Sequence, residues 1–231
     1  MIQAILFDKD GTLFDFYRTW GAVTEEAALI AVEGDAARAA DLMRRSGKDP
    51  ATGRYLPGSV IASGSNREIA ALWAEILGRT DVDALCDTVQ AHFFKRQPEV
   101  MHPVVDFNSF FARLRDRGYR LGIATMDSEA AAHQAMDKFG VRTALDFICG
   151  FDTGHGTKPG GGMVEAFGRM IDLPTSAIAV VGDSPHDMHM ARAGKAGRAV
   201  GVLTGVSSSE ALLEAGAHVV LESIADLEAA L

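Results

Sequence analysis

The first chemically suggestive residues are two aspartates, Asp8 and Asp10, which directly follow the apolar run 2–7. Such a run predicts a strand that is buried on both faces of a sheet. Because side chains two residues apart point the same way along extended backbone, both carboxylates would face the carboxyl-terminal edge of that sheet. Gly11 then permits a sharp turn, which the Thr12 hydroxyl can stabilise. Taken alone, the stretch is equally typical of a solvated Asp-Gly turn.

Three further loops carry side chains that could act together with these aspartates. Thr125 follows a second predicted buried strand, and Asp183 and Asp187 follow a later one. Lys158 lies in a glycine-rich stretch between them. In a parallel sheet the carboxyl ends of all strands lie at one edge, so loops that are distant in sequence can meet there. The order and spacing of these residues therefore predict a single polar site.

The residue types of this site predict its chemistry. Several carboxylates in one cleft repel one another, and two unit charges about 4 Å apart cost roughly 4 kcal/mol at an effective dielectric constant of about 20. The predicted cluster therefore needs a cation, and oxygen ligands without histidine favour a hard ion such as Mg²⁺. The Thr125 hydroxyl and the Lys158 ammonium are suited to phosphoryl oxygens. Together these groups predict metal-assisted chemistry on a phosphate ester.

The elements that must position these loops alternate between buried strands and helices. After residue 103, short apolar segments are each followed by a segment with helical periodicity. Such repeated βα units are typical of the α/β class with a Rossmann-like, doubly wound parallel sheet. Strands are predicted at 2–7, 119–124, 147–149, 177–181, 198–203 and 218–221. Helices are predicted at 106–117, 128–139 and 163–171, in a segment that ends at 193, and after each of the last two strands.

The stretch 15–97, between the first strand and the rest, has helical periodicity and no predicted strand. Proline and glycine punctuate residues 48–64, which predicts an ordered loop or a short extended piece there. The helices predicted in this stretch lie at 16–32, 36–45, 65–78 and 80–94. We therefore expect a discontinuous core, formed by 1–14 and 98–231, with an inserted α-helical cap domain at 15–97.

The bulk composition is that of a soluble globular protein of 231 residues, with 48% hydrophobic and 23% charged residues. A net charge of -9 argues against a general nucleic-acid or anionic-membrane surface. No apolar run reaches membrane-spanning length and no signal peptide precedes the first strand, so a cytoplasmic location is expected. Cys86 and Cys149 match no metal-binding spacing and are expected to be buried thiols.

The ordered motifs resemble those of the haloacid dehalogenase superfamily. They are Asp8-x-Asp10-Gly-Thr-Leu, Thr125 after a strand, Lys158-Pro, and Gly182-Asp183-x-x-x-Asp187. The resemblance covers essentially the whole chain and is closest to the phosphoglycolate-phosphatase-like group, with a helical C1-type cap after the first motif. It implies that Asp8 is the nucleophile and forms an aspartyl-phosphate. It also implies that Asp10 protonates the leaving alcohol and then activates the hydrolytic water.

The same resemblance implies a Mg²⁺ cofactor. Its ligands would be the Asp8 carboxylate, the Asp10 backbone carbonyl and Asp183, with Asp187 in an indirect or water-mediated contact. The side chain of Asp10 must lie close to the metal without binding it, because this carboxyl group has to exchange protons.

Thr125 and Lys158 would bind the phosphoryl oxygens and neutralise their charge. This sequence departs from the family pattern at two places. Met126 stands where many relatives have asparagine, and Lys158-Pro159 is followed by two glycines rather than by x-Pro. The first departure alters a contact beside the phosphate and the second loosens the loop, but neither removes a required group.

Substrate contacts are expected from Gly11, Thr12, Met126, Asp127 and Arg18. Asp127 also stands where a helix N-cap belongs, which competes with a role in the site. Arg18 begins the cap directly after the catalytic loop, where its guanidinium could bind a substrate carboxylate or a second phosphate. Acidic phosphoesters are therefore expected to be better substrates than neutral phosphosugars.

These inferences predict a Mg²⁺-dependent phosphatase that hydrolyses a small, phosphoglycolate-like phosphomonoester. A phosphosugar mutase is the alternative, because it shares the site and differs mainly in how its cap excludes water. A non-catalytic phosphate-binding regulator is a further alternative. The expected partner is a small phosphorylated metabolite, with no nucleic acid and no membrane. The chain is expected to be a monomer or a homodimer.

Overall fold

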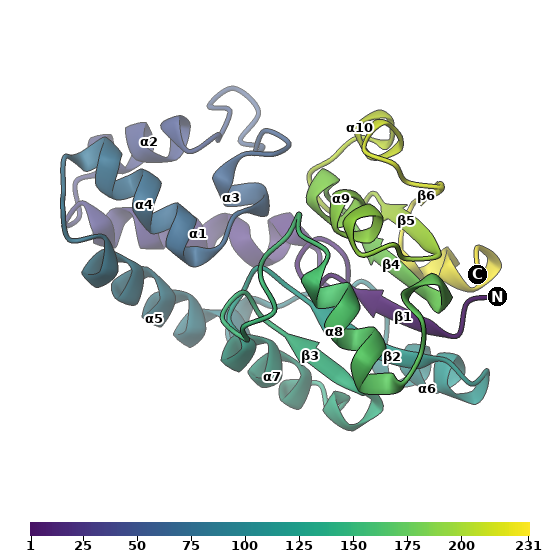
Figure 1. Cartoon of the computed structure of the whole chain (residues 1–231). Helices are drawn as coiled ribbons and strands as arrows, with labels where there is room; N and C mark the ends of the chain where they lie inside the picture. Colours follow the sequence, from purple (N-terminus) through teal and green to yellow (C-terminus); the bar gives the residue numbers. More distant parts are fainter.

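The computed structural model describes residues 1–231, apart from the side chains of Ser63 and Gln97. Its centre is a six-stranded parallel sheet with the order β3-β2-β1-β4-β5-β6, the strand order of Rossmann-like folds. The predicted α/β doubly wound sheet is therefore confirmed (Figure 1). The strands are β1 (Ala4–Phe7), β2 (Arg120–Ala124), β3 (Phe147–Cys149), β4 (Ile178–Gly182), β5 (Arg198–Val202) and β6 (Val219–Leu221).

Helices cover both faces of this sheet. One face carries α6 (Phe107–Asp116), α7 (Glu129–Lys138) and the 3-10 helix η3 (Ile224–Ala229). The other face carries α8 (Gly162–Ile171), α9 (Pro185–Ala193) and α10 (Ser209–Glu214). Two short 3-10 helices, η1 (Arg142–Ala144) and η2 (Thr175–Ala177), precede β3 and β4. The helix predicted after the last strand is thus a 3-10 helix, whereas the other predicted core helices are α-helices.

β1 consists of four apolar residues that are fully buried. A strand with apolar side chains on both faces is stable in the middle of a sheet that helices cover on both sides. β1 pairs with β2 on one side and with β4 on the other. Alternate side chains point to opposite faces. Ile5 and Phe7 join the hydrophobic cluster that contains Phe110 of α6. Leu6 joins the cluster around Phe167 of α8 on the other face. The loop after β1 therefore begins at a point that packing fixes from both sides.

The stretch between β1 and β2 contains a helical insert, made of α1 (Phe16–Ala31), α2 (Ala36–Arg45), α3 (Val60–Ser63), α4 (Asn66–Leu77) and α5 (Val82–Val100). These helices share their own hydrophobic cluster, which includes the fully buried Trp73. The Trp73 indole N–H donates to Ser46 Oγ over 2.8 Å and so links α4 to the end of α2. The insert lies beyond the carboxyl end of β1 (Figure 1). The helical insert occurs where it is expected, and the division into two domains stays a prediction.

Two predictions for this insert are corrected by the structure. The helix predicted at 80–94 continues to Val100 and contains Pro98. A proline so near a helix end removes only one backbone hydrogen bond, and Val100 still packs against the insert's cluster. Residues 48–64 contain the short helix α3 and a β-bridge between Lys48 and Tyr55, where only a loop or extended piece is expected.

Two further features agree with the sequence. Cys86 and Cys149 are buried free thiols, as expected. None of the described helices combines the length and the apolar character that crossing a bilayer requires.

We predict that Leu6→Ala lowers the free energy of unfolding by about 2–5 kcal/mol, because it leaves a cavity in the centre of the sheet. Leu213→Ala is the matched control, since Leu213 is 52% exposed on α10 and should change stability little. Urea unfolding followed by far-UV circular dichroism measures both variants. Equal midpoints for the two variants would contradict the central packing of β1.

Candidate active site

The loop after β1 turns sharply at Gly11. This residue has a φ of +88°, and a Cβ atom there would lie 2.6 Å from the Asp183 carboxylate. Both observations require glycine. The Thr204 hydroxyl donates to the Gly11 carbonyl over 2.6 Å and holds the turn. Thr12 is fully buried. Of the predicted substrate contacts, Gly11 and Thr12 therefore shape the loop and are not among the residues that line the cavity.

Three carboxylates meet beside this turn. Asp8 follows β1, and Asp183 and Asp187 follow β4, with one oxygen of each residue within 4.8 Å of the others. The Lys158 ammonium lies 2.5 Å from Asp8 Oδ1 and 2.6 Å from Asp187 Oδ1. All four side chains are buried. The sheet edge thus brings together the loops that the sequence predicts to converge.

The electrostatics of this cluster favour an added cation. Burial raises the pKa of Asp8 to about 7, although the positive charge of Lys158 opposes that rise. Burial and the charges of Asp8 and Asp187 raise the pKa of Asp183 well above its usual range. Asp8 Oδ2 is buried and, within the described part of the chain, has no hydrogen-bond partner. A hard divalent ion fits this set of oxygen ligands.

Asp187 is held more firmly than the other two carboxylates. It is the third residue of the capping box that opens α9, and its Oδ2 accepts from the Ser184 N–H and hydroxyl over 3.1 and 2.6 Å. Its Oδ1 accepts from Lys158. Both oxygens already have donors, which supports an indirect role beside a metal. Among the described residues, Asp183 accepts only a 3.3 Å hydrogen bond from the Val206 N–H, so its carboxylate is better placed to bind a metal.

The loop after β2 carries Thr125, Met126 and Asp127, which all line the cavity. Thr125 is buried, and its Oγ1 accepts from the Asp127 N–H over 3.1 Å. The N-cap of α7 is Ser128, whose side chain accepts from the Ala131 N–H. The interpretation of Asp127 as that cap is therefore wrong. Its carboxylate faces the interior, where a buried charge from the loop after β1 requires it.

That buried charge is Lys9, which sequence reasoning missed. Its side chain is fully buried, and its Nζ lies 2.6 Å from Asp10 Oδ2 and 3.0 Å from Asp127 Oδ2. The ammonium also lies 5.6 Å from the ring centroid of Trp20. Burial raises the pKa of Asp10, and the charge of Lys9 opposes that rise. A lysine between two aspartates at the end of a buried strand is the sequence signal that could have revealed this group.

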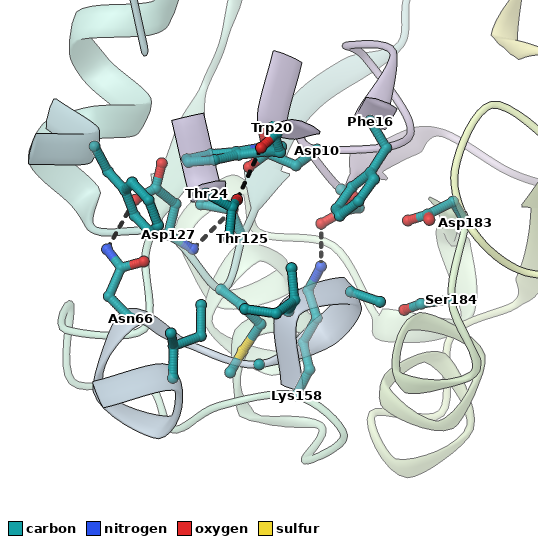
Figure 2. A pocket seen from close by; sticks show the side chains of 17 residues that line it. Asp10, Phe16, Trp20, Thr24, Asn66, Thr125, Asp127, Lys158, Asp183 and Ser184 are labelled. Carbon is teal, nitrogen blue, oxygen red and sulfur yellow. Dashed lines mark hydrogen bonds and ion pairs between the residues drawn. The ribbon is translucent and has the colours of Figure 1, made fainter. Parts of the chain in front are cut away.

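The insert supplies the other wall of the cavity (Figure 2). The side chains are Phe16, Trp20 and Thr24 from α1, Ile61 and Ala62 from α3, Asn66 and Ile69 from α4, and Phe93 from α5. Asn66 Nδ2 lies 3.5 Å from Asp127 Oδ1 and so joins this wall to the core. The cavity is partly open to solvent and has a volume of about 70 Å³.

Arg18 does not join this wall. It is exposed on α1 and is not among the described residues that line the cavity. The helix explains its position, because Arg18 is two residues from both Phe16 and Trp20 and therefore lies roughly 200° around the axis from either. Its expected contact with substrate is thus not supported by this arrangement.

We predict that Asp183→Asn weakens Mg²⁺ binding at least about tenfold, because it removes one of the three clustered negative charges. Asp116→Asn removes the same charge from an exposed position at the end of α6 and serves as the control. Isothermal titration of each protein with Mg²⁺ measures the effect. Unchanged affinity in Asp183→Asn would show that the cluster does not bind the ion.

Known proteins share both the sequence pattern and the fold. Residues 2–195 match the family of haloacid dehalogenase-like hydrolases. The probable phosphatase IndB of Dickeya dadantii is 29% identical over 117 residues, which is half of this chain and half of IndB. A hydrolase from Pseudomonas syringae superposes with a TM-score of 0.74 at 22% identity, covering 98% of this chain and 96% of that one.

Two further solved structures share the fold at similar distance. A predicted phosphoglycolate phosphatase from Haemophilus somnus has a TM-score of 0.73 at 17% identity, covering 99% of this chain and 97% of that one. CbbY from Rhodobacter sphaeroides, in complex with phosphate, has a TM-score of 0.69 at 21% identity, covering 98% and 96%. The family match spans most of the chain, including every predicted catalytic residue. The chain therefore belongs to the haloacid dehalogenase-like hydrolases.

Proposed function

We propose that this hydrolase is a Mg²⁺-dependent phosphatase that cleaves a small phosphomonoester through an aspartyl-phosphate on Asp8. The observation that carries the proposal is the environment of Asp8. One of its oxygens is fixed by Lys158, and the other is buried in the wall of the cavity without a hydrogen-bond partner among the described residues. A carboxylate held in this way is oriented for in-line attack on phosphorus. The name of IndB, probable phosphatase, agrees with this proposal.

In the first step, an Asp8 oxygen attacks phosphorus and the bond to the ester oxygen breaks, with a proton passing from Asp10 to the leaving alcohol. In the second step, Asp10 takes a proton from water, whose oxygen attacks the phosphoryl group and releases Asp8 and inorganic phosphate. The Thr125 hydroxyl and the Lys158 ammonium hold the phosphoryl oxygens. Bound near Asp8, Asp183 and Asp187, Mg²⁺ would supply positive charge that neutralises the carboxylates and the phosphoryl oxygens.

Asp10 suits the role of acid and base. Burial raises the pKa of its carboxyl group, although Lys9 and the Trp20 indole lower it in part, so the group can hold the proton that it passes to the leaving alcohol. The carboxylate lines the cavity from the core side. Its pairing with Lys9 fixes its orientation, and its backbone carbonyl as a metal ligand stays a prediction.

The experiment that tests the function is Asp8→Asn. The amide cannot attack phosphorus, so release of phosphate from p-nitrophenyl phosphate should fall at least about a thousandfold while far-UV circular dichroism is unchanged. EDTA should abolish phosphate release by the wild-type protein, and added Mg²⁺ should restore this activity.

Substantial turnover by Asp8→Asn would refute the mechanism. Transfer of the phosphoryl group to another hydroxyl of the same sugar, without release of phosphate, would favour the mutase. Binding without turnover would favour the regulator.

A second prediction concerns Lys9. Lys9→Met leaves Asp10 and Asp127 without their shared counter-charge, so Asp10 loses its position beside the leaving group. Hydrolysis of an alkyl phosphate should then fall at least about tenfold more than hydrolysis of p-nitrophenyl phosphate, whose leaving group needs little protonation. Lys95→Met, at an exposed position on α5, is the control. Equal losses for the two esters would show that Lys9 stabilises the fold without positioning Asp10.

A further inference from the structure

The wall that the insert contributes to the cavity carries no charged group among the side chains that the structure describes. Its members are apolar, aromatic or neutral polar, and they surround the space next to the phosphoryl-binding groups (Figure 2). Trp20 and Phe93 pack edge to face, with ring centroids 5.0 Å apart. Ser63, which the sequence places beside this wall, lies outside the described side chains. The part of a substrate that leaves with the alcohol would therefore meet a mainly apolar surface.

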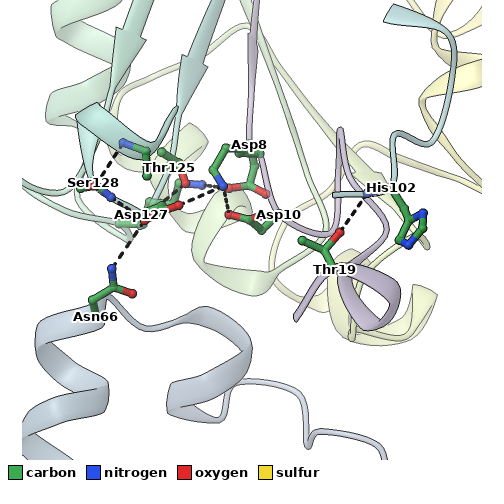
Figure 3. Close-up of polar contacts among 11 residues, drawn as sticks. Asp8, Asp10, Thr19, Asn66, His102, Thr125, Asp127 and Ser128 are labelled. Atoms are coloured by element: carbon green, nitrogen blue, oxygen red, sulfur yellow. Dashed lines mark hydrogen bonds and ion pairs between the residues drawn. The ribbon is translucent and has the colours of Figure 1, made fainter. Parts of the chain in front are cut away.

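The two neutral polar groups of this wall present acceptors. The Thr24 hydroxyl donates to the Trp20 carbonyl over 2.8 Å, so toward a ligand its oxygen can act only as an acceptor. Asn66 turns its amide nitrogen toward the Asp127 carboxylate, which can only accept, so its amide oxygen points elsewhere (Figure 3). Asp127 adds a further acceptor from the core side, whereas Asp10 would carry the proton that it passes to the leaving oxygen. A substrate here gains hydrogen bonds by donating from hydroxyl or N–H groups.

The cations of the insert lie away from this wall. Arg18 is exposed on the far side of α1. Arg54 stacks over the Tyr17 ring, with the guanidinium carbon 4.7 Å from the centroid, and is exposed. Arg67 pairs with Asp83 over 2.6 Å at the surface. None of these residues is among the described residues that line the cavity.

The two lysines beside the cavity, Lys158 and Lys9, already have partners. Lys158 lies between Asp8 and Asp187, where the phosphoryl group binds. Lys9 is paired with Asp10 and Asp127 beneath Trp20. A second anion on the substrate would lose its hydration among aromatic rings and face the Asp127 carboxylate, without a cation of its own. Such a group would bind poorly, because burying an unpaired charge is strongly unfavourable.

We propose that the phosphoryl group is the substrate's only anionic group, and that the leaving group is a small, uncharged alcohol with an apolar face and at least one further hydroxyl or N–H donor. This proposal rests on the phosphatase function and names its substrate class. The insert wall faces the groups that would bind the phosphoryl group, so it limits how far a leaving group can extend. The proposal reverses the sequence-based expectation that Arg18 selects acidic phosphoesters.

The test compares glycerol 1-phosphate with 3-phosphoglycerate. The two esters share a three-carbon skeleton and a hydroxyl group, and differ in a hydroxymethyl group against a carboxylate. Phosphate release with Mg²⁺ gives kcat/KM for each, with p-nitrophenyl phosphate as the reference for general activity. We expect kcat/KM to be at least about tenfold higher for glycerol 1-phosphate. Equal kcat/KM values for the two esters, or a higher value for 3-phosphoglycerate, would overturn the proposal.

A charge added to the wall should shift this ratio. Ile61→Arg places a cation in the cavity and should make hydrolysis of the carboxylate ester about tenfold more efficient relative to glycerol 1-phosphate. Ile30→Arg adds the same group on α1, where Ile30 is 45% exposed and outside the cavity, and should leave the wild-type ratio. Arg18→Ala should also leave the ratio of kcat/KM for the two esters unchanged. A selective loss of 3-phosphoglycerate hydrolysis in that variant would contradict the proposal.

These outcomes separate the substrate class from the function. Release of phosphate with a carboxylate preference refutes the substrate class and leaves the phosphatase function intact. No release from any of the three esters refutes the phosphatase function, and the substrate class with it.

Discussion

The buried charges at the carboxyl end of β1 must be balanced, and the rest of the site depends on this constraint. Asp8 and Lys9 are almost fully buried, and Asp10 follows them directly with its side chain in the cavity wall. An ionised group that leaves water costs several kcal/mol unless a partner compensates it. The partners come from distant parts of the chain: Lys158 lies 150 residues beyond Asp8, and Asp127 comes from the loop after β2. The charges of one short loop therefore require two other loops to converge on it.

The strand order makes that convergence possible. β1 lies between β2 and β4, so the loops that carry Asp127 and Asp183 emerge on either side of the loop that carries Asp8. Glycines let these loops approach closely. A Cβ atom at Gly205 would lie 1.6 Å from an Asp183 oxygen, and one at Gly182 would lie 2.2 Å from the carboxyl carbon of Asp187. Side chains at these two positions would push the carboxylates apart, so the glycines are part of the site although they contribute no functional group.

Much of this arrangement could be predicted from the sequence. The alternation of apolar strands and helices predicts the parallel sheet, and the sheet edge predicts that Asp8, Lys158 and Asp183 meet, because both depend on local patterns and one topological rule. The pairing of Lys9 with Asp127 was missed, because a local sequence pattern does not show which distant carboxylate a lysine contacts. The end of α5 and the N-cap of α7 were misplaced for a related reason. α5 continues past Pro98 because its last residue packs against the insert. Asp127 is not the N-cap of α7 because its carboxylate pairs with Lys9.

The two walls of the cavity differ in what determines them. The core wall follows from motifs whose residues have fixed places in the loops at the sheet edge, so the groups proposed to bind the phosphoryl group can be named before the structure is known. The insert wall depends on how α1, α3, α4 and α5 are rotated about their axes. Trp20 and Arg18 lie roughly 200° apart around the axis of α1, so the rotation of this helix decides which of the two faces the cavity. The walls meet where Asn66 contacts Asp127, which in turn pairs with Lys9. The contact between the two walls is therefore continuous with the ion pairs of Asp10 and Asp127 with Lys9, so in the proposed mechanism recognition of the leaving group and its protonation would depend on the same few side chains.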